Sequence, residues 1–308
     1  MKASPLFFLS FLIIISSNEA SADSLFNNKL ETQLRFDDRS NRDHRFQYRV
    51  RAYSAFSIPD TSWTINAFAV TGDEFSSSHN TIDSDVSNYF YLRRIYFRHT
   101  GSLGSKTEIG VIPTYKGRVS SSGLAKDGWI KGARHVYAYD SATKFEVVVG
   151  ELEDDDASTA LDSLRKLNYV ELEISSQIND YSSYEVSLER MTDANFARAE
   201  YRYFTPDSPT YSIEMISRLS TSKTKFVLGL EDEITLFDRP FEYYAYYSYV
   251  SRRFGARAEL TEDFITTGSG LSVEIETNIL QSDSWEAFAR LDVFDQNTRF
   301  ILGVGYAL

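Results

Sequence analysis

Apolar and polar side chains alternate along most of this chain, and the alternation limits what the chain can fold into. In residues 45–56, for example, Phe46, Tyr48 and Val50 alternate with polar residues. A period of two places successive side chains on opposite faces of a β-strand, so each such segment has one apolar and one polar face. The pattern predicts an all-β protein with few helices.

Short polar turns such as 140–143 (DSAT) and 220–223 (STSK) separate the alternating segments. The seventeen candidate strands are 29–37, 45–57, 62–70, 88–100, 105–112, 128–139, 144–152, 167–176, 183–190, 196–204, 210–218, 224–231, 241–250, 254–262, 270–279, 285–293 and 299–308. Bacterial single-chain barrels have even strand numbers, so one candidate is expected to be wrong. Assigning loops to sides from both ends of the chain places the error between residues 153 and 231. We predict about sixteen strands, with fourteen or eighteen as alternatives.

Two all-β architectures could hold so many strands. A soluble sandwich buries its apolar face between sheets, and a propeller repeats every 40–50 residues or so, a repeat that this sequence lacks. A transmembrane barrel instead turns its apolar face to lipid and gathers aromatic residues at the two membrane interfaces. The chain has 22 Phe and 20 Tyr, with five tyrosines between 243 and 249. We therefore predict a transmembrane antiparallel up-and-down β-barrel, with aromatic packing in a soluble sheet as the alternative.

The first 22 residues have the features of a secretory signal peptide. Lys2 precedes an apolar run from Leu6 to Ile15, and Ala20-Ser21-Ala22 provides the small residues that a signal peptidase accepts. A retained membrane anchor is the alternative, but the run is only about half a bilayer span. We expect a single barrel domain over residues 23–308. Its net charge of -12 argues against nucleic acid as a partner, and the absence of cysteine excludes disulfides.

The end of the chain carries the most motif-like segment. The signal peptide, the amphipathic strands and the terminal residues Phe300, Leu302, Val304, Tyr306 and Leu308 resemble a Gram-negative outer-membrane β-barrel of the porin type. In that family the last strand usually ends in Phe and is read by the barrel assembly machinery. Here Leu308 replaces that residue, and Tyr306 keeps the aromatic position third from the end. The resemblance implies an outer-membrane location, contact with outer-membrane lipids and lipopolysaccharide, and passage of small hydrophilic solutes, and it leaves a homo-oligomer open.

No motif predicts catalysis, a cofactor or a metal site. None of the four histidines is followed by the serine that outer-membrane phospholipases place two residues later. His79 with Asp83 and Asp85 resembles the dyad of omptin-like proteases only loosely. The acidic run 151–156 lacks calcium-loop spacing, and is either a solvated loop or a place where carboxylates and lipopolysaccharide phosphates share divalent cations.

Arginines share one face of two candidate strands. Arg45, Arg49 and Arg51 lie opposite the apolar face of one strand, and Arg94 and Arg98 share a face of another. An arginine facing lipid at mid-membrane costs about 2–4 kcal/mol, so these side chains are predicted to line the pore. The alternative, equally supported, is that they brace the wall by pairing with lumen carboxylates. The candidate partners are Glu31, Glu108, Glu171 and Glu185.

A long segment, residues 113–128, stands between two short turns. If the first strand starts on the periplasmic side, this is the third outward loop, and in general porins the loop after the fifth strand folds into the lumen. The resemblance thus implies a constriction loop, with Lys116, Arg118, Lys126 and Asp127 at the pore or its edge. A surface flap is the alternative.

Together these features predict a channel for passive diffusion of small hydrophilic solutes. The net charge favours cations at the mouths and the arginines favour anions inside; the nearer charges should decide, giving a preference for anionic solutes such as acidic sugars. A structural or adhesive barrel with a filled lumen is the main alternative, and a hydrolase is the third. Inward serines such as Ser187 and Ser272 favour an open lumen, whereas Phe68 and Phe288 favour a filled one.

Overall fold

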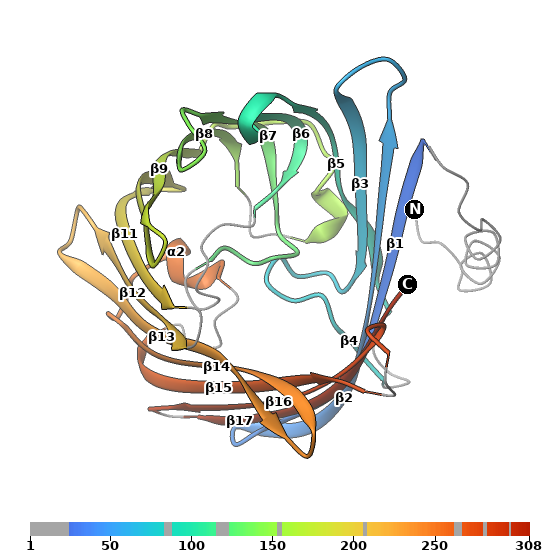
Figure 1. Cartoon of the computed structure of the whole chain (residues 1–308), viewed down its shortest axis with the longest axis vertical. Helices are drawn as coiled ribbons and strands as arrows, with labels where there is room; N and C mark the ends of the chain where they lie inside the picture. Colours follow the sequence, from blue (N-terminus) through green and yellow to red (C-terminus); the bar gives the residue numbers. More distant parts are fainter. Residues whose placement is uncertain are drawn as a thin grey trace.

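Antiparallel strands make up most of the chain and close into a ring (Figure 1). The computed structural model describes residues 25–82, 88–114, 123–152, 156–205, 208–261, 267–279, 282–295 and 297–308. The strands are β1 (Phe26–Arg39), β2 (Arg42–Ser57), β3 (Trp63–Thr71), β4 (Asn80–Thr81), β5 (Phe90–Thr100), β6 (Lys106–Pro113), β7 (Trp129–Ala138), β8 (Thr143–Glu151), β9 (Tyr169–Asn179), β10 (Ser182–Met191), β11 (Ala194–Thr205), β12 (Ser208–Arg218), β13 (Lys223–Leu236), β14 (Arg239–Val250), β15 (Gly268–Asn278), β16 (Trp285–Phe294) and β17 (Thr298–Ala307). The predicted signal peptide lies outside the described residues.

Sixteen of the described strands form the barrel wall. Each pairs with its neighbours in the chain, and β1 pairs with β17 from Glu31–Ala307 to Arg39–Arg299, which closes the ring. The two-residue strand β4 pairs with β2 at Gln47 and Tyr48, beyond the end of β3. The predicted fold, a sixteen-stranded antiparallel barrel, is confirmed.

The false candidate strand is 254–262, so the predicted position of the error, between 153 and 231, was wrong. This segment lies in the connection between β14 and β15 and contains the short helix α2 (Ala256–Glu259). Gly255 precedes the helix with a φ of 91°, a left-handed conformation that suits glycine. Phe254, Ala258 and Leu260 are buried in a loop core. Their period-two spacing therefore reflects packing inside the barrel and not a lipid-facing strand.

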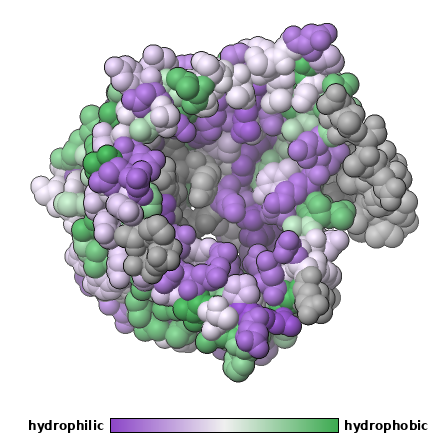
Figure 2. All heavy atoms as spheres, viewed as in Figure 1, coloured by the Kyte–Doolittle hydropathy of each residue, from purple (hydrophilic) through white to green (hydrophobic). Residues whose placement is uncertain are grey.

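The two faces of the wall differ as the alternation predicts. In β17 the outward residues Phe300, Leu302 and Val304 are exposed, whereas Arg299 and Ile301 are buried. Figure 2 shows hydrophilic side chains gathered inside the ring and hydrophobic ones on much of the outer wall. No helix among the described residues is long and apolar enough to span a membrane.

The two ends of the barrel differ in the length of their connections. We call the end that holds residue 26 and Leu308 the terminal end, and the opposite end the loop end. The described parts of the four long connections, 72–89, 114–128, 152–168 and 251–267, all lie at the loop end. Outer-membrane barrels have short periplasmic turns and longer outer loops, and the two ends of this barrel differ in the same way.

Parts of all four long connections meet inside the barrel at the loop end. Phe75, Leu124, Leu152 and Phe254, one from each connection, belong to a single buried apolar cluster. The inward side chains of the wall that complete it come mainly from β6 to β12. They include Ile112, Val148, Tyr169, Met191, Phe196 and Ile216. We call this cluster the loop core; it occupies one side of the lumen, and Figure 1 shows α2 inside the ring.

Candidate functional site

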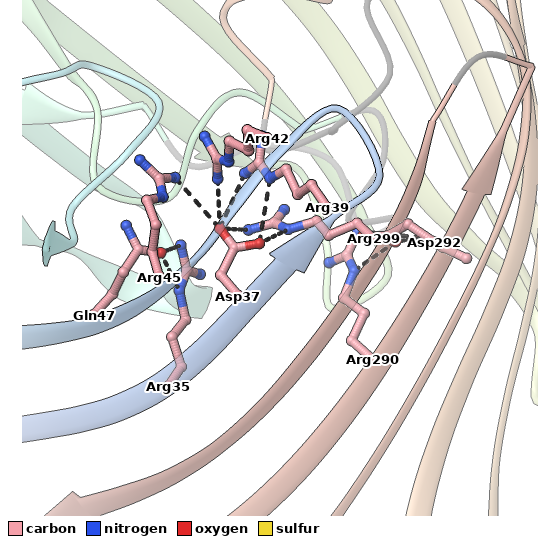
Figure 3. A network of polar contacts seen from close by, with 10 residues as sticks. Arg35, Asp37, Arg39, Arg42, Arg45, Gln47, Arg290, Asp292 and Arg299 are labelled. Atoms are coloured by element: carbon pink, nitrogen blue, oxygen red, sulfur yellow. Dashed lines mark hydrogen bonds and ion pairs between the residues drawn. The ribbon is translucent and has the colours of Figure 1, made fainter.

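A cluster of arginines lies on the wall opposite the loop core, where β1, β2 and β17 meet. Asp37 is fully buried at its centre and accepts hydrogen bonds or ion pairs from four arginines (Figure 3). The distances to its carboxylate oxygens are 3.2 Å from Arg39, 2.7 Å from Arg42, 3.4 Å from Arg45 and 2.9 Å from Arg299. Four cations thus share one carboxylate. We call Asp37 and these four arginines the Asp37 cluster.

Two of the four arginines of this cluster are partly exposed inside the barrel, whereas Arg39 and Arg299 are mostly buried, as is the aspartate. The side chains of Arg42 and Arg45 are 31% and 33% exposed, whereas that of Asp37 is 0% exposed. One rung further from the loop end, Arg35 donates two hydrogen bonds, of 3.0 and 2.8 Å, to the Gln47 side-chain oxygen. The guanidinium groups of Arg42 and Arg45 are therefore more accessible from the barrel interior than the carboxylate of Asp37.

The three predicted arginines of β2, Arg45, Arg49 and Arg51, do not all lie in the same environment. Arg45 belongs to the Asp37 cluster, and Arg49 lies between it and Arg51 on the same inward face. Arg51 is instead paired: its guanidinium nitrogen lies 2.8 Å from Asp127 and another lies 3.4 Å from Glu31. Arg51 is buried, so it braces the wall against the β6–β7 connection.

The two predicted arginines of β5 are also held by partners. Arg94 donates to the carbonyl of Lys126 at 2.6 Å and stacks over Phe68, with 4.1 Å to the ring centroid. Arg98 forms a 2.8 Å ion pair with Glu108. Arg51 and Arg98 therefore pair with carboxylates, as the bracing alternative describes, whereas Arg94 is held by a backbone carbonyl and an aromatic ring.

A third arginine of β5, Arg93, was not predicted. The register between β3 and β5 shifts at this residue, so Arg93 and Arg94 are both buried instead of lying on opposite faces. Arg93 donates to the carbonyls of Thr71, Gly72 and Ser77 at 3.2, 2.9 and 3.2 Å, and to that of Asp127 at 3.4 Å. It thus ties two long connections to the wall.

The described part of the predicted constriction loop lies inside the barrel. Lys116 and Arg118 fall outside the described residues. Asp127 is buried against Arg51, whereas the Lys126 side chain is exposed. Burial alone would raise the pKa of Asp127, but the charges of Arg51 and Arg49 and the hydrogen bond from Arg51 hold it well below its usual range. Ala125 also donates to the carbonyl of Leu260 at 2.9 Å, which joins this loop to the β14–β15 connection.

A second charge cluster lies on the side of the loop core, with the opposite composition. Arg198 on β11 is 1% exposed and contacts four carboxylates. These are Glu173 at 3.5 Å, Glu185 at 3.0 Å, Glu200 and Glu214. All four are mostly buried, so this Arg198 cluster presents little charge to the lumen.

The predicted assembly signal closes the barrel. Tyr306 packs against Trp285 of β16, with 4.8 Å between ring centroids. Leu308 exchanges two backbone hydrogen bonds with Leu30 of β1, of 3.0 and 2.9 Å. Both residues therefore lie at the seam between the last and first strands; their reading by an assembly machinery stays a prediction.

No protein-family model and no curated protein sequence matches this chain. Solved structures do match. Three mutant forms of the porin of Rhodopseudomonas blastica superpose with TM-scores of 0.63, 0.63 and 0.62 at 13%, 13% and 14% sequence identity. Each match covers 92% of this chain and 100% of the porin chain.

The chain has the porin fold. At this level of identity the likeness concerns the course of the backbone and does not extend to the side chains that line this porin-type barrel.

Sequence reasoning missed most of the Asp37 cluster. Arg39 and Arg299 lie on different strands, far apart in the sequence, and meet only because β1 pairs with β17. The inward face of β1 did carry a signal, since Arg35, Asp37 and Arg39 occupy every second position. Combined with closure of the barrel, that spacing would have placed Arg35, Asp37 and Arg39 beside the arginines of β2.

Proposed function

We propose that this chain is an outer-membrane channel for passive diffusion of small hydrophilic solutes, with a preference for anions such as acidic sugars. In this proposal residues 1–22 direct export and are removed, and the barrel assembly machinery inserts the chain among outer-membrane lipids and lipopolysaccharide. Transport through a water-filled barrel needs no catalyst, because pore radius and lining charge select the solutes. Self-association is compatible with the proposal and is not required by it.

The observation that carries the proposal is the uneven filling of the loop end. The loop core occupies the side next to β6–β12, so in the proposed channel the passage runs along the opposite wall, which holds the Asp37 cluster. Four arginines contact one carboxylate there, and two of them, Arg42 and Arg45, are about one-third exposed. These guanidinium groups attract an anion that passes this wall and repel a cation.

The net charge of -12 opposes this preference. Charges at the mouths are screened over about 8 Å at physiological ionic strength. Charges that line a narrow passage act on a solute within a few ångströms, where less water intervenes. The local excess of arginine should therefore outweigh the overall acidity of the chain.

A barrel with a filled lumen is the second candidate, and the loop core is the observation that favours it. Apolar residues from four connections pack inside the barrel, and Phe68 and Phe288 point inward and are buried. If this packing extends across the whole lumen, the protein conducts no ions and serves a structural or adhesive role.

Single-channel recording in planar bilayers distinguishes the two candidates. For the unchanged chain we expect steady conductance and, in a KCl gradient, a reversal potential displaced toward the anion value. The double variant R42Q/R45Q should displace it toward the cation value, because both side chains face the lumen. A matched double variant, R165Q/R239Q, removes two exposed charges away from this wall and should leave the reversal potential unchanged.

Two results would count against the proposal. Absence of conductance in a correctly folded barrel would favour the filled lumen. Conductance with the same reversal potential in R42Q/R45Q would remove the anion preference and leave only a general channel.

A further inference from the structure

An apolar groove of about 400 Å³ lies on the outer wall, across β11 to β15. Tyr203 and Tyr211 border one side, Leu230 and Ala245 lie in its middle, and Tyr247 borders the other side. Tyr203, Tyr211 and Tyr247 are 44%, 52% and 40% exposed, and they belong to the outward-facing set of their strands. The groove is therefore a feature of the lipid-facing surface and does not open into the lumen.

The register explains why the wall is hollow there. Leu230 pairs with Ala245, and Ala245 pairs with Val273, so a methyl group stands between two longer side chains on neighbouring strands. Tyr203 and Tyr211 also pair with each other, and form a raised edge beside Leu230. Small outward residues between large ones leave a depression that these side chains cannot fill.

The position of the groove identifies its surroundings. Tyr203 and Tyr211 lie on either side of the connection between β11 and β12, at the terminal end. The groove thus begins near the short turns and runs toward mid-strand. Tyrosines near strand ends mark the membrane interface in such barrels, and short turns mark the periplasmic side.

We infer that this groove binds one acyl chain of a phospholipid from the periplasmic leaflet. Placing water in an apolar depression within the membrane costs free energy. Because the groove is continuous with the lipid-facing wall, hydrocarbon is its natural occupant. A volume of about 400 Å³ is within the range of small-molecule sites, about 300–1,000 Å³. Lipopolysaccharide would reach the wall from the other leaflet, and the groove is nearest the terminal end. The inference rests on the membrane location of the barrel and not on conduction.

The variant A245W tests the inference by filling the groove from its middle. The unchanged chain, purified in a mild detergent and mixed with dioleoyl phosphatidylglycerol, should retain lipid that native mass spectrometry detects. Loss of contact with about two methylene groups weakens binding about tenfold, and A245W should show at least this loss. A245L fills less space and should give an intermediate loss. A133W is the control, because Ala133 is exposed on β7, away from the groove.

Three results would overturn the inference that the groove binds an acyl chain. Heat-dependent gel mobility first shows which variants have folded, and A245L replaces A245W if A245W has not folded. Equal retention by the filled variant and A133W would overturn the inference, as would preferential retention of lipopolysaccharide. Unchanged lipid retention with loss of an oligomer would make the groove a contact between copies. The Ala245 side chain points away from the lumen, so conductance should stay the same, and this separates the inference from the proposed channel.

Discussion

The Asp37 cluster and the Arg198 cluster are built on the same plan with the charges exchanged. In one, four arginines surround a single aspartate where β1, β2 and β17 meet; in the other, four glutamates surround a single arginine on β9 to β12. The central residue is buried in both, but the surrounding groups differ. Arg42 and Arg45 are about one-third exposed, whereas Glu200 and Glu214 are almost fully buried.

This difference in exposure determines which cluster can interact electrostatically with an ion inside the barrel. Charges exposed to the lumen act on such an ion, while charges within a packed network mainly interact with one another. Under the proposed function the two clusters have different roles: the Arg198 cluster stabilises the wall beneath the loop core, and the Asp37 cluster sets the electrostatic potential that a passing solute experiences.

The largest expected effect is on stability, from R198M. The substitution removes the cation that contacts all four buried carboxylates, and breaking a buried ion pair costs about 3–5 kcal/mol. The midpoint of urea unfolding in detergent should fall sharply. Adding E200Q and E214Q should recover part of the loss, because fewer charges then remain unpaired. Full stability of R198M alone would show that the glutamates do not depend on Arg198.

A somewhat smaller effect is expected from R51A, since Arg51 and Asp127 are both 7% exposed and some water can reach them. The substitution leaves a buried carboxylate on the β6–β7 connection, and should release that loop from the wall. Limited proteolysis should then cut the loop sooner, and the channel current should become noisier. D127A should have a similar effect, and R51A/D127A should cost less than the sum of the two single changes.

The exchange D37N should have opposite effects on stability and selectivity. It removes a carboxylate that accepts several charge-assisted hydrogen bonds, at about 1.5–3 kcal/mol for one such bond, but water can solvate the exposed arginines. We therefore expect a modest decrease in the unfolding midpoint together with a stronger anion preference in the reversal potential. A loss of stability as large as that of R198M would mean that the two clusters are equally closed to water.

How far the sequence predicts this molecule depends on the range of each interaction. The strands follow from alternation within about ten residues, so their faces were predictable, including that of Arg45, Arg49 and Arg51. Pairing with Asp127 depends on where a long loop folds, and the partners of Arg198 come from four different strands. A period-two pattern does not encode such contacts. For the same reason 254–262 resembled a strand although its apolar residues pack in the loop core.

The smallest effect concerns pH and His79, which lies in the β3–β4 connection with its Nε2 2.8 Å from the Gln33 side-chain oxygen. Burial, together with the charges of Arg35 and Arg49 and of other arginines of this wall, holds its pKa well below the usual 6.5. The unfolded chain then binds a proton near pH 6.5 and the folded chain does not.

The contribution of His79 to stability should therefore decrease as pH falls below about 6.5, by at most about 1.4 kcal/mol per pH unit, and level off below its folded pKa. Asp127 contributes nothing in this window, because its folded pKa lies below the ordinary aspartate value of about 3.9, so its stabilisation is lost only under more acidic conditions. Comparing the thermal unfolding of the unchanged chain and of H79Q between pH 6.5 and 5 isolates the contribution of His79 to the pH dependence. If the positive wall acts on His79, H79Q should lose part of the pH dependence, and R35Q should reduce it less. Equal slopes in all three proteins would show that the arginine field does not reach this histidine, and would weaken the contrast between the two walls.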